Sequence, residues 1–143
     1  MEPQLFLFTL ALITALAAAT HIVRWRLRGR KLRALAGEWG LHYAPTDQFQ
    51  LADRVAPQLP CPGAADVRVT DLIYGLKGER FRYIFTAEFT QGVVRTKHRS
   101  RRVVSMTESK DRSARDTLIP DLAVAPEELS LLDQYQSLGT KTP

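Results

Sequence analysis

The stretch LFLFTLALITALAAATHIVRWRLRGRKLR, residues 5–33, decides how the rest of the chain is arranged. Its first part, residues 5–23, has no charged side chain, no Pro and no Gly. These 19 residues extend about 28 Å as a helix, close to the roughly 30 Å of a bilayer's hydrocarbon core. Six cations and no anion follow in residues 24–33. We therefore expect a short tail at 1–4, a transmembrane helix at 5–23 and a basic juxtamembrane helix at 24–40.

Cations directly after an apolar span favour the cytoplasmic side for the part of the chain that follows. We therefore expect the N-terminus outside and the C-terminal domain in the cytoplasm, with Trp25 as an interfacial anchor. A cleavable signal peptide is the alternative, because Ala17-Ala18-Ala19 resembles a cleavage site. The opening segment MEPQ carries no Lys or Arg, which favours a retained anchor.

The remaining residues are sufficient for one small domain with a modest core. Leu32, Leu35, Ala36 and Trp39 share one helix face, and Gly40 is typical of the helix end. Residues 41–44 are expected to be extended up to a proline at 45. Asp47 is expected to cap a short helix over residues 49–55, ended by a proline at 57.

Alternating side chains predict the sheet. Strands are expected at 66–75, 80–90 and 101–107, with a turn at 77–79, a solvated loop at 108–116 and a short strand at 122–124. A helix is expected to begin at Pro126 and to turn Leu129, Leu132, Tyr135 and Leu138 inward. The prediction is an α+β fold: one transmembrane helix, then an antiparallel sheet of about three or four strands with flanking helices. Its domain covers residues 41–138, and 139–143 form a C-terminal tail.

Aromatic residues alternate along the strand at 80–90, where Phe81, Tyr83, Phe85 and Phe89 share one face. Such a face either stacks RNA bases or fills a hydrophobic core. We interpret it as core, because it is the only strongly apolar face of this strand.

Three sequence segments, taken in order, resemble those of a known group of proteins. Residues 33–43 follow the pattern R-x-L-A-x-E-x-G-L-x-Y, residues 47–51 follow D-x-F-x-L, and a strand ends in Ile73-Tyr74-Gly75. Together with the anchor, this order resembles small membrane-tethered bacterial proteins of no assigned activity. The resemblance covers residues 24–107, and it implies an antiparallel sheet with helices, a bacterial inner membrane and no catalytic residues.

Residues that carry acid–base or metal chemistry are sparse. His21, His42 and His98 have no ligand-like spacing, and Cys61 is the only cysteine. No nucleophile motif and no phosphate-binding glycine loop is present. We therefore expect no catalytic, cofactor-binding or metal-binding residues, no cofactor and no enzyme.

Charge is strongly segregated along the chain, whose net charge is +5. Residues 94–115 carry eight cations and two anions, and residues 116–143 carry one cation and five anions. Basic blocks seek phosphate on lipids or on nucleic acid. The candidate contacts with anionic lipid are Arg24, Arg26, Arg28, Arg30, Lys31, Arg33, Arg95, Lys97, Arg99, Arg101 and Arg102.

The function expected from the sequence is a non-enzymatic, membrane-anchored interaction module, an accessory or assembly subunit of a larger membrane complex. Its expected partners are membrane lipids and membrane proteins, since a short sheet leaves an edge open to another chain. The alternatives are a module that binds anionic lipid or, less favoured, RNA through the second basic block, and a small membrane-bound enzyme.

Overall fold

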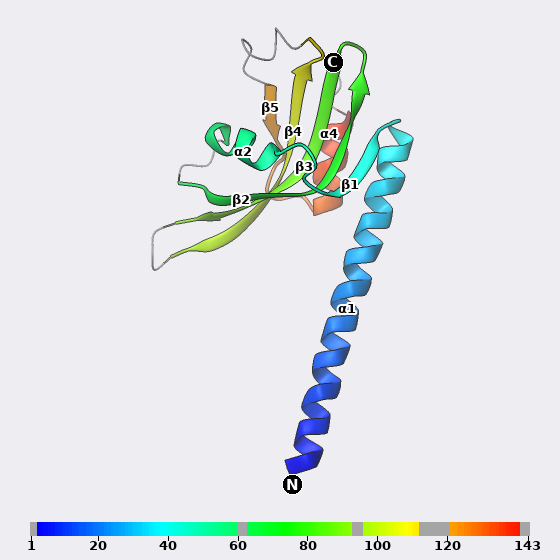
Figure 1. Cartoon of the computed structure of the whole chain (residues 1–143), viewed down its shortest axis with the longest axis vertical. Coiled ribbons are helices and arrows are strands. Elements are labelled where there is room, and N and C mark those ends of the chain that lie inside the picture. The colour runs from blue at the N-terminus through cyan, green and yellow to red at the C-terminus, as the bar shows by residue number, and fades with distance from the viewer. Residues whose placement is uncertain (1–2, 60–62, 93–95, 112–120, 141–143) are drawn as a thin grey trace. The chain divides into compact units, whose positions relative to one another are not determined.

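The computed structural model describes residues 3–59, 63–92, 96–111 and 121–140. Figure 1 shows a long N-terminal helix, an antiparallel sheet and short helices, and this arrangement confirms the predicted α+β fold. The elements in chain order are α1 (Pro3–Glu38), β1 (His42–Thr46), α2 (Leu51–Val55), the 3-10 turn η1 (Ala56–Gln58), β2 (Ala65–Lys77), β3 (Arg80–Gln91), β4 (His98–Ser109), β5 (Asp121–Val124) and α4 (Leu131–Thr140).

Contacts divide the chain into two compact units, residues 1–31 and 32–143. The described part of the first unit is entirely helix, and none of its most apolar window is buried within the protein. Phe8, for example, is 75% exposed. Within the described residues, α1 is the one helix long and apolar enough to cross a membrane.

The second unit begins inside α1, whose last turns bury Leu32, Leu35 and Ala36 as the spacing predicted. The helix ends at Gly40, which has a φ of 67°, and Leu41 N donates to Ala36 O at 2.8 Å. This bond and the left-handed glycine form a Schellman cap. The predicted helix end is confirmed.

Asp47 binds the start of α2 with both carboxylate oxygens. Its Oδ1 accepts from the backbone N–H groups of Phe49 and Leu51 at 3.1 and 3.0 Å, and Oδ2 accepts from Ala52 N at 2.9 Å. The prediction that Asp47 accepts hydrogen bonds from this helix is confirmed, but the helix begins at Leu51 and its N-cap residue is Gln50, which makes no side-chain cap. The prediction that Pro57 ends this helix is confirmed, because α2 ends at Val55 and Pro57 lies in the following 3-10 turn η1.

The sheet has strand order β1-β2-β3-β4-β5, with every neighbouring pair antiparallel. The described strands number five, and β2, β3 and β4 are longer than predicted. Glu108, expected in a solvated loop, is buried on β4 and forms an ion pair with Arg54 of α2. This ion pair explains how a charged residue can lie inside the strand.

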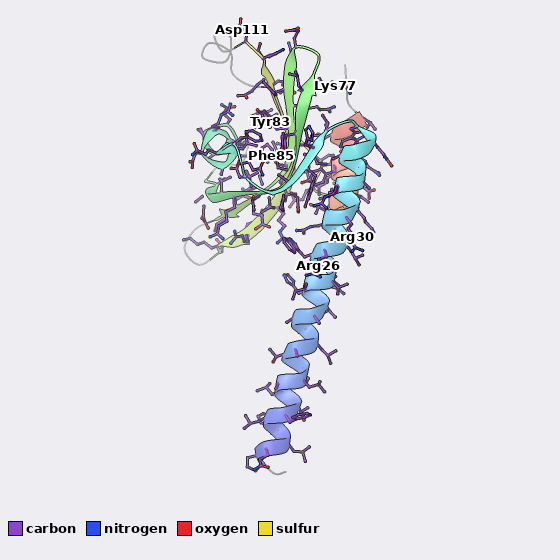
Figure 2. The ribbon with its side chains drawn as sticks, turned by 45° about the vertical axis from the view of Figure 1, so that its right-hand side comes forward. Arg26, Arg30, Lys77, Tyr83, Phe85 and Asp111 are labelled. Atoms are coloured by element: carbon purple, nitrogen blue, oxygen red, sulfur yellow. The ribbon has the colours of Figure 1, made fainter. Side chains whose placement is uncertain are left out.

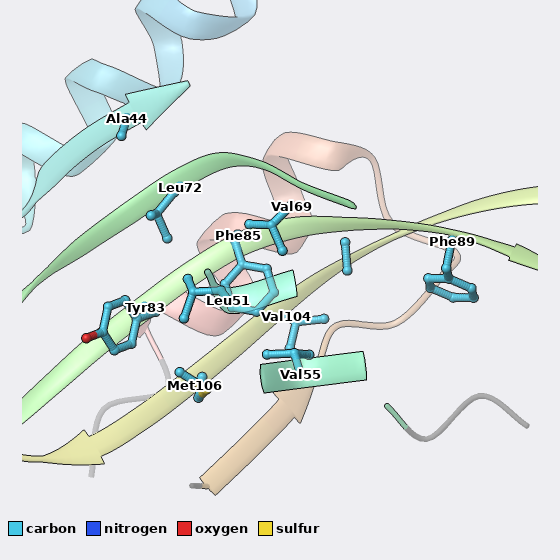
Figure 3. Close-up of a cluster of buried hydrophobic side chains, with 11 residues drawn as sticks. Ala44, Leu51, Val55, Val69, Leu72, Tyr83, Phe85, Phe89, Val104 and Met106 are labelled. Atoms are coloured by element: carbon cyan, nitrogen blue, oxygen red, sulfur yellow. The ribbon is translucent and has the colours of Figure 1, made fainter. Parts of the chain in front are cut away.

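Both faces of the sheet are buried. On one face, α2 covers the aromatic residues of β3, and Figure 3 shows Phe85 beside Leu51 and Val104. Burial of Tyr83, Phe85 and Phe89 agrees with the prediction that these rings form core. The opposite face of β3 is mainly polar, but it also contributes one residue to a core, because Ile84 is fully buried there.

The opposite face packs against the end of α1 and against α4, around the buried ring of Tyr135. A β-bulge at Asp71, with a φ of 52°, lets polar groups meet there. The Asp71 carboxylate accepts from Tyr43 Oη at 2.8 Å, and its backbone carbonyl accepts from Tyr135 Oη at 2.6 Å. Thr86 Oγ1 lies 2.8 Å from Tyr135 Oη. This buried network fixes α4 on the sheet.

Helix α4 begins at Leu131, and not at Pro126 as predicted. Ser130 caps it, because Ser130 Oγ accepts from Asp133 N at 3.3 Å and donates to the Asp133 carboxylate at 2.5 Å. At its other end, the buried guanidinium of Arg82 donates to the carbonyl of Leu138. Burial lowers the pKa of Arg82, yet an arginine remains charged and suits the negative end of the helix dipole.

Helix α4 also continues to Thr140, two residues into the segment predicted as a tail. Of the four leucine and tyrosine positions expected to face inward, Tyr135 and Leu138 are buried, Leu132 is half-buried and Leu129 is exposed.

The variant Gly139→Ala tests the packing of α4 on Trp39. An added Cβ overlaps two carbons of the Trp39 ring, so alanine forces this contact apart and lowers the free energy of unfolding by about 1–3 kcal/mol. The matched control is Gly37→Ala in α1, where an added Cβ meets nothing within 4 Å. Its higher helix propensity raises the free energy of unfolding by up to about 1 kcal/mol. Urea unfolding in micelles measures the free energy of unfolding of both variants. A change in the same direction for the two variants contradicts the packing of Gly139 against Trp39.

Candidate functional site

The central strands extend beyond the edge strands at one end of the sheet. Strand β1 pairs only with Thr70–Tyr74 of β2, and β5 pairs only with Val104–Thr107 of β4. Strands β3 and β4 stay paired as far as Gln91 and His98. We call this three-stranded extension the β-arm; it comprises residues 65–69, 87–91 and 98–102. Figure 1 shows the hairpin of β3 and β4 projecting past β5.

The hydrogen bonds of Val103 reveal which backbone groups of β4 point away from β3. Val103 O accepts from Ala125 N at 2.9 Å, and Val103 N donates to Gln134 Oε1 at 3.2 Å. Both Val103 groups therefore face the outer edge of β4. Alternate residues of an antiparallel strand point the same way, so the N–H and C=O groups of Arg99 and Arg101 also face this edge. No group in the described part of the chain bonds to them there.

The chain leaves this edge at Pro126. Proline has no N–H to donate to a strand ladder, and the next residue, Glu127, turns its carboxylate to Arg102 with a separation of 2.6 Å. Among the described residues, none therefore continues the strand line of β5 beside Arg101 and Arg99.

The other side of the β-arm is a less regular edge. Asp66 has a φ of 51°, and the register between β2 and β3 shifts between Ala65 and Arg68. Bulges of this kind twist an edge away from a potential partner strand. Of the two edges, that of β4 is the one that keeps a regular register.

Acidic residues partly neutralise the second basic block. Glu88 of β3 lies between two cations: its Oε1 is 2.8 Å from Arg101 Nε, and its Oε2 is 3.4 Å from Arg99 Nη2. The Glu88 side chain is 15% exposed. Three cations of the block, Arg99, Arg101 and Arg102, therefore meet two acids, Glu88 and Glu127, while Lys97 and His98 lie exposed nearby.

The remaining predicted lipid-contact residues lie elsewhere. Figure 2 shows Arg26 and Arg30 on α1, and the same helix carries Arg24, Arg28 and Lys31 in the first unit. Trp25, the predicted interfacial anchor, is exposed on this helix.

Arg33 belongs to the second unit, where its guanidinium carbon lies 5.6 Å from the centre of the Tyr43 ring. Arg95 and Cys61 fall outside the described residues.

Two further features bear on the alternatives raised by the sequence. Of the aromatic residues that alternate along β3, Tyr83, Phe85 and Phe89 are buried, whereas Phe81 is half-buried. In the parts of the chain that the structure describes, no group of three or more His, Cys, Asp or Glu side chains is arranged to hold a metal ion.

Comparison with known proteins gives no relative: no protein-family model, no curated protein and no solved structure matches the chain. The candidate site therefore rests on its geometry alone.

The ion pair of Glu88 with Arg101 is testable by a double-mutant cycle. We expect Glu88→Gln and Arg101→Gln to couple by about 0.3–1 kcal/mol in the free energy of unfolding, the usual size for a partly exposed pair. Glu127→Gln combined with Arg101→Gln is the control, with coupling near zero, because Glu127 contacts Arg102 instead. Denaturant unfolding gives the four values of each cycle. Equal coupling in both cycles contradicts the assignment of Glu88 to Arg101.

Proposed function

We propose that this chain is a non-enzymatic, single-pass membrane-anchored interaction module that serves as an accessory or assembly subunit of a larger membrane complex. The observation that carries this proposal is the open outer edge of β4 at Arg99 and Arg101. Exposed strand edges pair with other chains unless they are blocked. An edge kept regular in a domain tethered to a membrane helix is suited to a partner in or near the same membrane.

The anchor supports this placement. The second unit begins at Leu32, nine residues after the predicted span ends at Val23, so the domain is tethered close to the bilayer. The cations of residues 24–33 favour a cytoplasmic domain, and the resemblance to membrane-tethered bacterial proteins favours the inner membrane.

A reporter fused to the C-terminus tests this orientation. We expect green fluorescent protein to fluoresce there and alkaline phosphatase to be inactive, since the first needs the cytoplasm and the second needs disulfides formed outside it. Fusions directly after residue 40 provide the control for effects of the domain. Active phosphatase at the C-terminus contradicts the proposed orientation.

A protein partner fits the basic block better than a lipid surface. Arg99, Arg101 and Arg102 already contact acids of their own domain, which reduces the charge left to attract anionic head groups. The open N–H and C=O groups beside them find complementary groups in a polypeptide strand.

Photo-cross-linking in native membranes tests the proposal. We expect a photoreactive residue at Arg99 to give a defined protein adduct after gentle solubilisation, because a partner covers this edge. The same residue at Asp53, exposed on α2, is the matched control and gives none. Mass spectrometry identifies the adducts. Recovery of monomer alone from both positions contradicts an assembly role.

A further inference from the structure

We propose that the outer edge of β4 at residues 99–101 binds an acidic, extended segment of a partner protein by strand addition. This inference rests on the proposed interaction function and names the chemistry of the partner.

The backbone of β4 defines where the added strand lies. Val103 bonds to the chain's own Ala125 and to the side chain of Gln134, and in the part of the chain that the structure describes, pairing along this edge ends at Val103. The next outward-facing groups belong to Arg101 and then to Arg99. A strand that enters there continues the line of β5, with one N–H and one C=O from each arginine available to it.

The chain itself shows which side chains suit this position. Glu127 follows directly where the chain leaves the β5 line, and its carboxylate contacts Arg102. On the other face of the sheet, Arg99 and Arg101 both form ion pairs with Glu88. Their side chains remain 45% and 57% exposed to solvent, respectively. An added strand therefore has arginines beside both of its faces, and acidic side chains on it gain cross-strand ion pairs.

The same charges exclude a second copy of this chain as the occupant. Antiparallel pairing of two β4 edges sets arginines against arginines, and like charges directly opposite each other are destabilising. The available edge is also short, so the affinity of an isolated segment is modest. Attachment of both partners to one membrane compensates, because it raises their effective concentration.

The experiment uses the full chain in nanodiscs of neutral phosphatidylcholine and a labelled short peptide of alternating Glu and Thr. We expect binding by fluorescence anisotropy, and none by the matched peptide of alternating Lys and Thr. N-methylation of the peptide's backbone nitrogens keeps the charge and removes the donors, so we expect it to abolish binding. Binding that survives N-methylation shows that charge alone is recognised and overturns strand addition.

Two variants separate the backbone from the side chain. Arg101→Ala and Arg101→Pro both lose the guanidinium, but only the proline variant also loses the outward N–H, at an edge position that tolerates proline. We expect the proline variant to bind the Glu–Thr peptide about fivefold to tenfold more weakly than the alanine variant, the factor for one lost hydrogen bond. Circular dichroism confirms that both are folded. Equal affinities overturn the proposal.

Two outcomes distinguish this inference from the function on which it rests. Cross-linked protein at Arg99 without binding of the Glu–Thr peptide leaves the interaction module in place and overturns strand addition by an acidic segment. Flotation of the nanodisc-embedded chain with phosphatidylserine vesicles, without peptide binding, assigns the basic block to lipid and overturns the inference as well.

Discussion

Backbone hydrogen bonding along β4 is the constraint on which the rest of the domain depends. On one side, β3 pairs with this strand over its whole length. On the other, the partner changes from β5 to Ala125 and then to the side chain of Gln134. Beyond Val103 the described chain supplies no partner, and the residues there are arginines whose charged ends keep the edge hydrated. Charged side chains thus lie where the described chain provides no hydrogen-bond partner for the outer backbone groups of β4.

Helices bury both faces of the sheet, with α2 on one face and two helices on the other. The last turns of α1 and the whole of α4 pack on Ile84 and its neighbours. Their polar ends must be satisfied inside the core, which explains why Arg82 reaches the final carbonyls of α4 and why Tyr135 bonds to the bulged backbone of Asp71. The helix that is long and apolar enough to span a membrane thereby also contributes core residues to the domain.

Local signals in the sequence predicted the local features of the fold. Three such signals act within a few residues: the glycine at 40, the carboxylate of Asp47 and the alternation along β3. The helix end, the hydrogen bonds to α2 and the strand that they predict are all present. Features that depend on distant partners were missed. Burial of Glu108 requires Arg54, and burial of Ile84 requires helices at both ends of the chain. At the candidate site, the sequence identified the arginines as a basic block. It could not identify their acidic partners or the direction of the backbone groups, because both depend on strand register.

The basic block and the acidic end of the chain are parts of one electrostatic arrangement. Sequence alone separates them into residues 94–115 and 116–143, yet the path of the chain after β5 brings Glu127 to Arg102, and pairing with β3 brings Glu88 to Arg101. In both contacts the guanidinium meets a carboxylate carried on or beside a strand. Guanidinium groups bind carboxylates through directed hydrogen bonds. The directed geometry of these bonds requires that each carboxylate be held in place, which β3 does for Glu88 and the path of the chain after β5 does for Glu127.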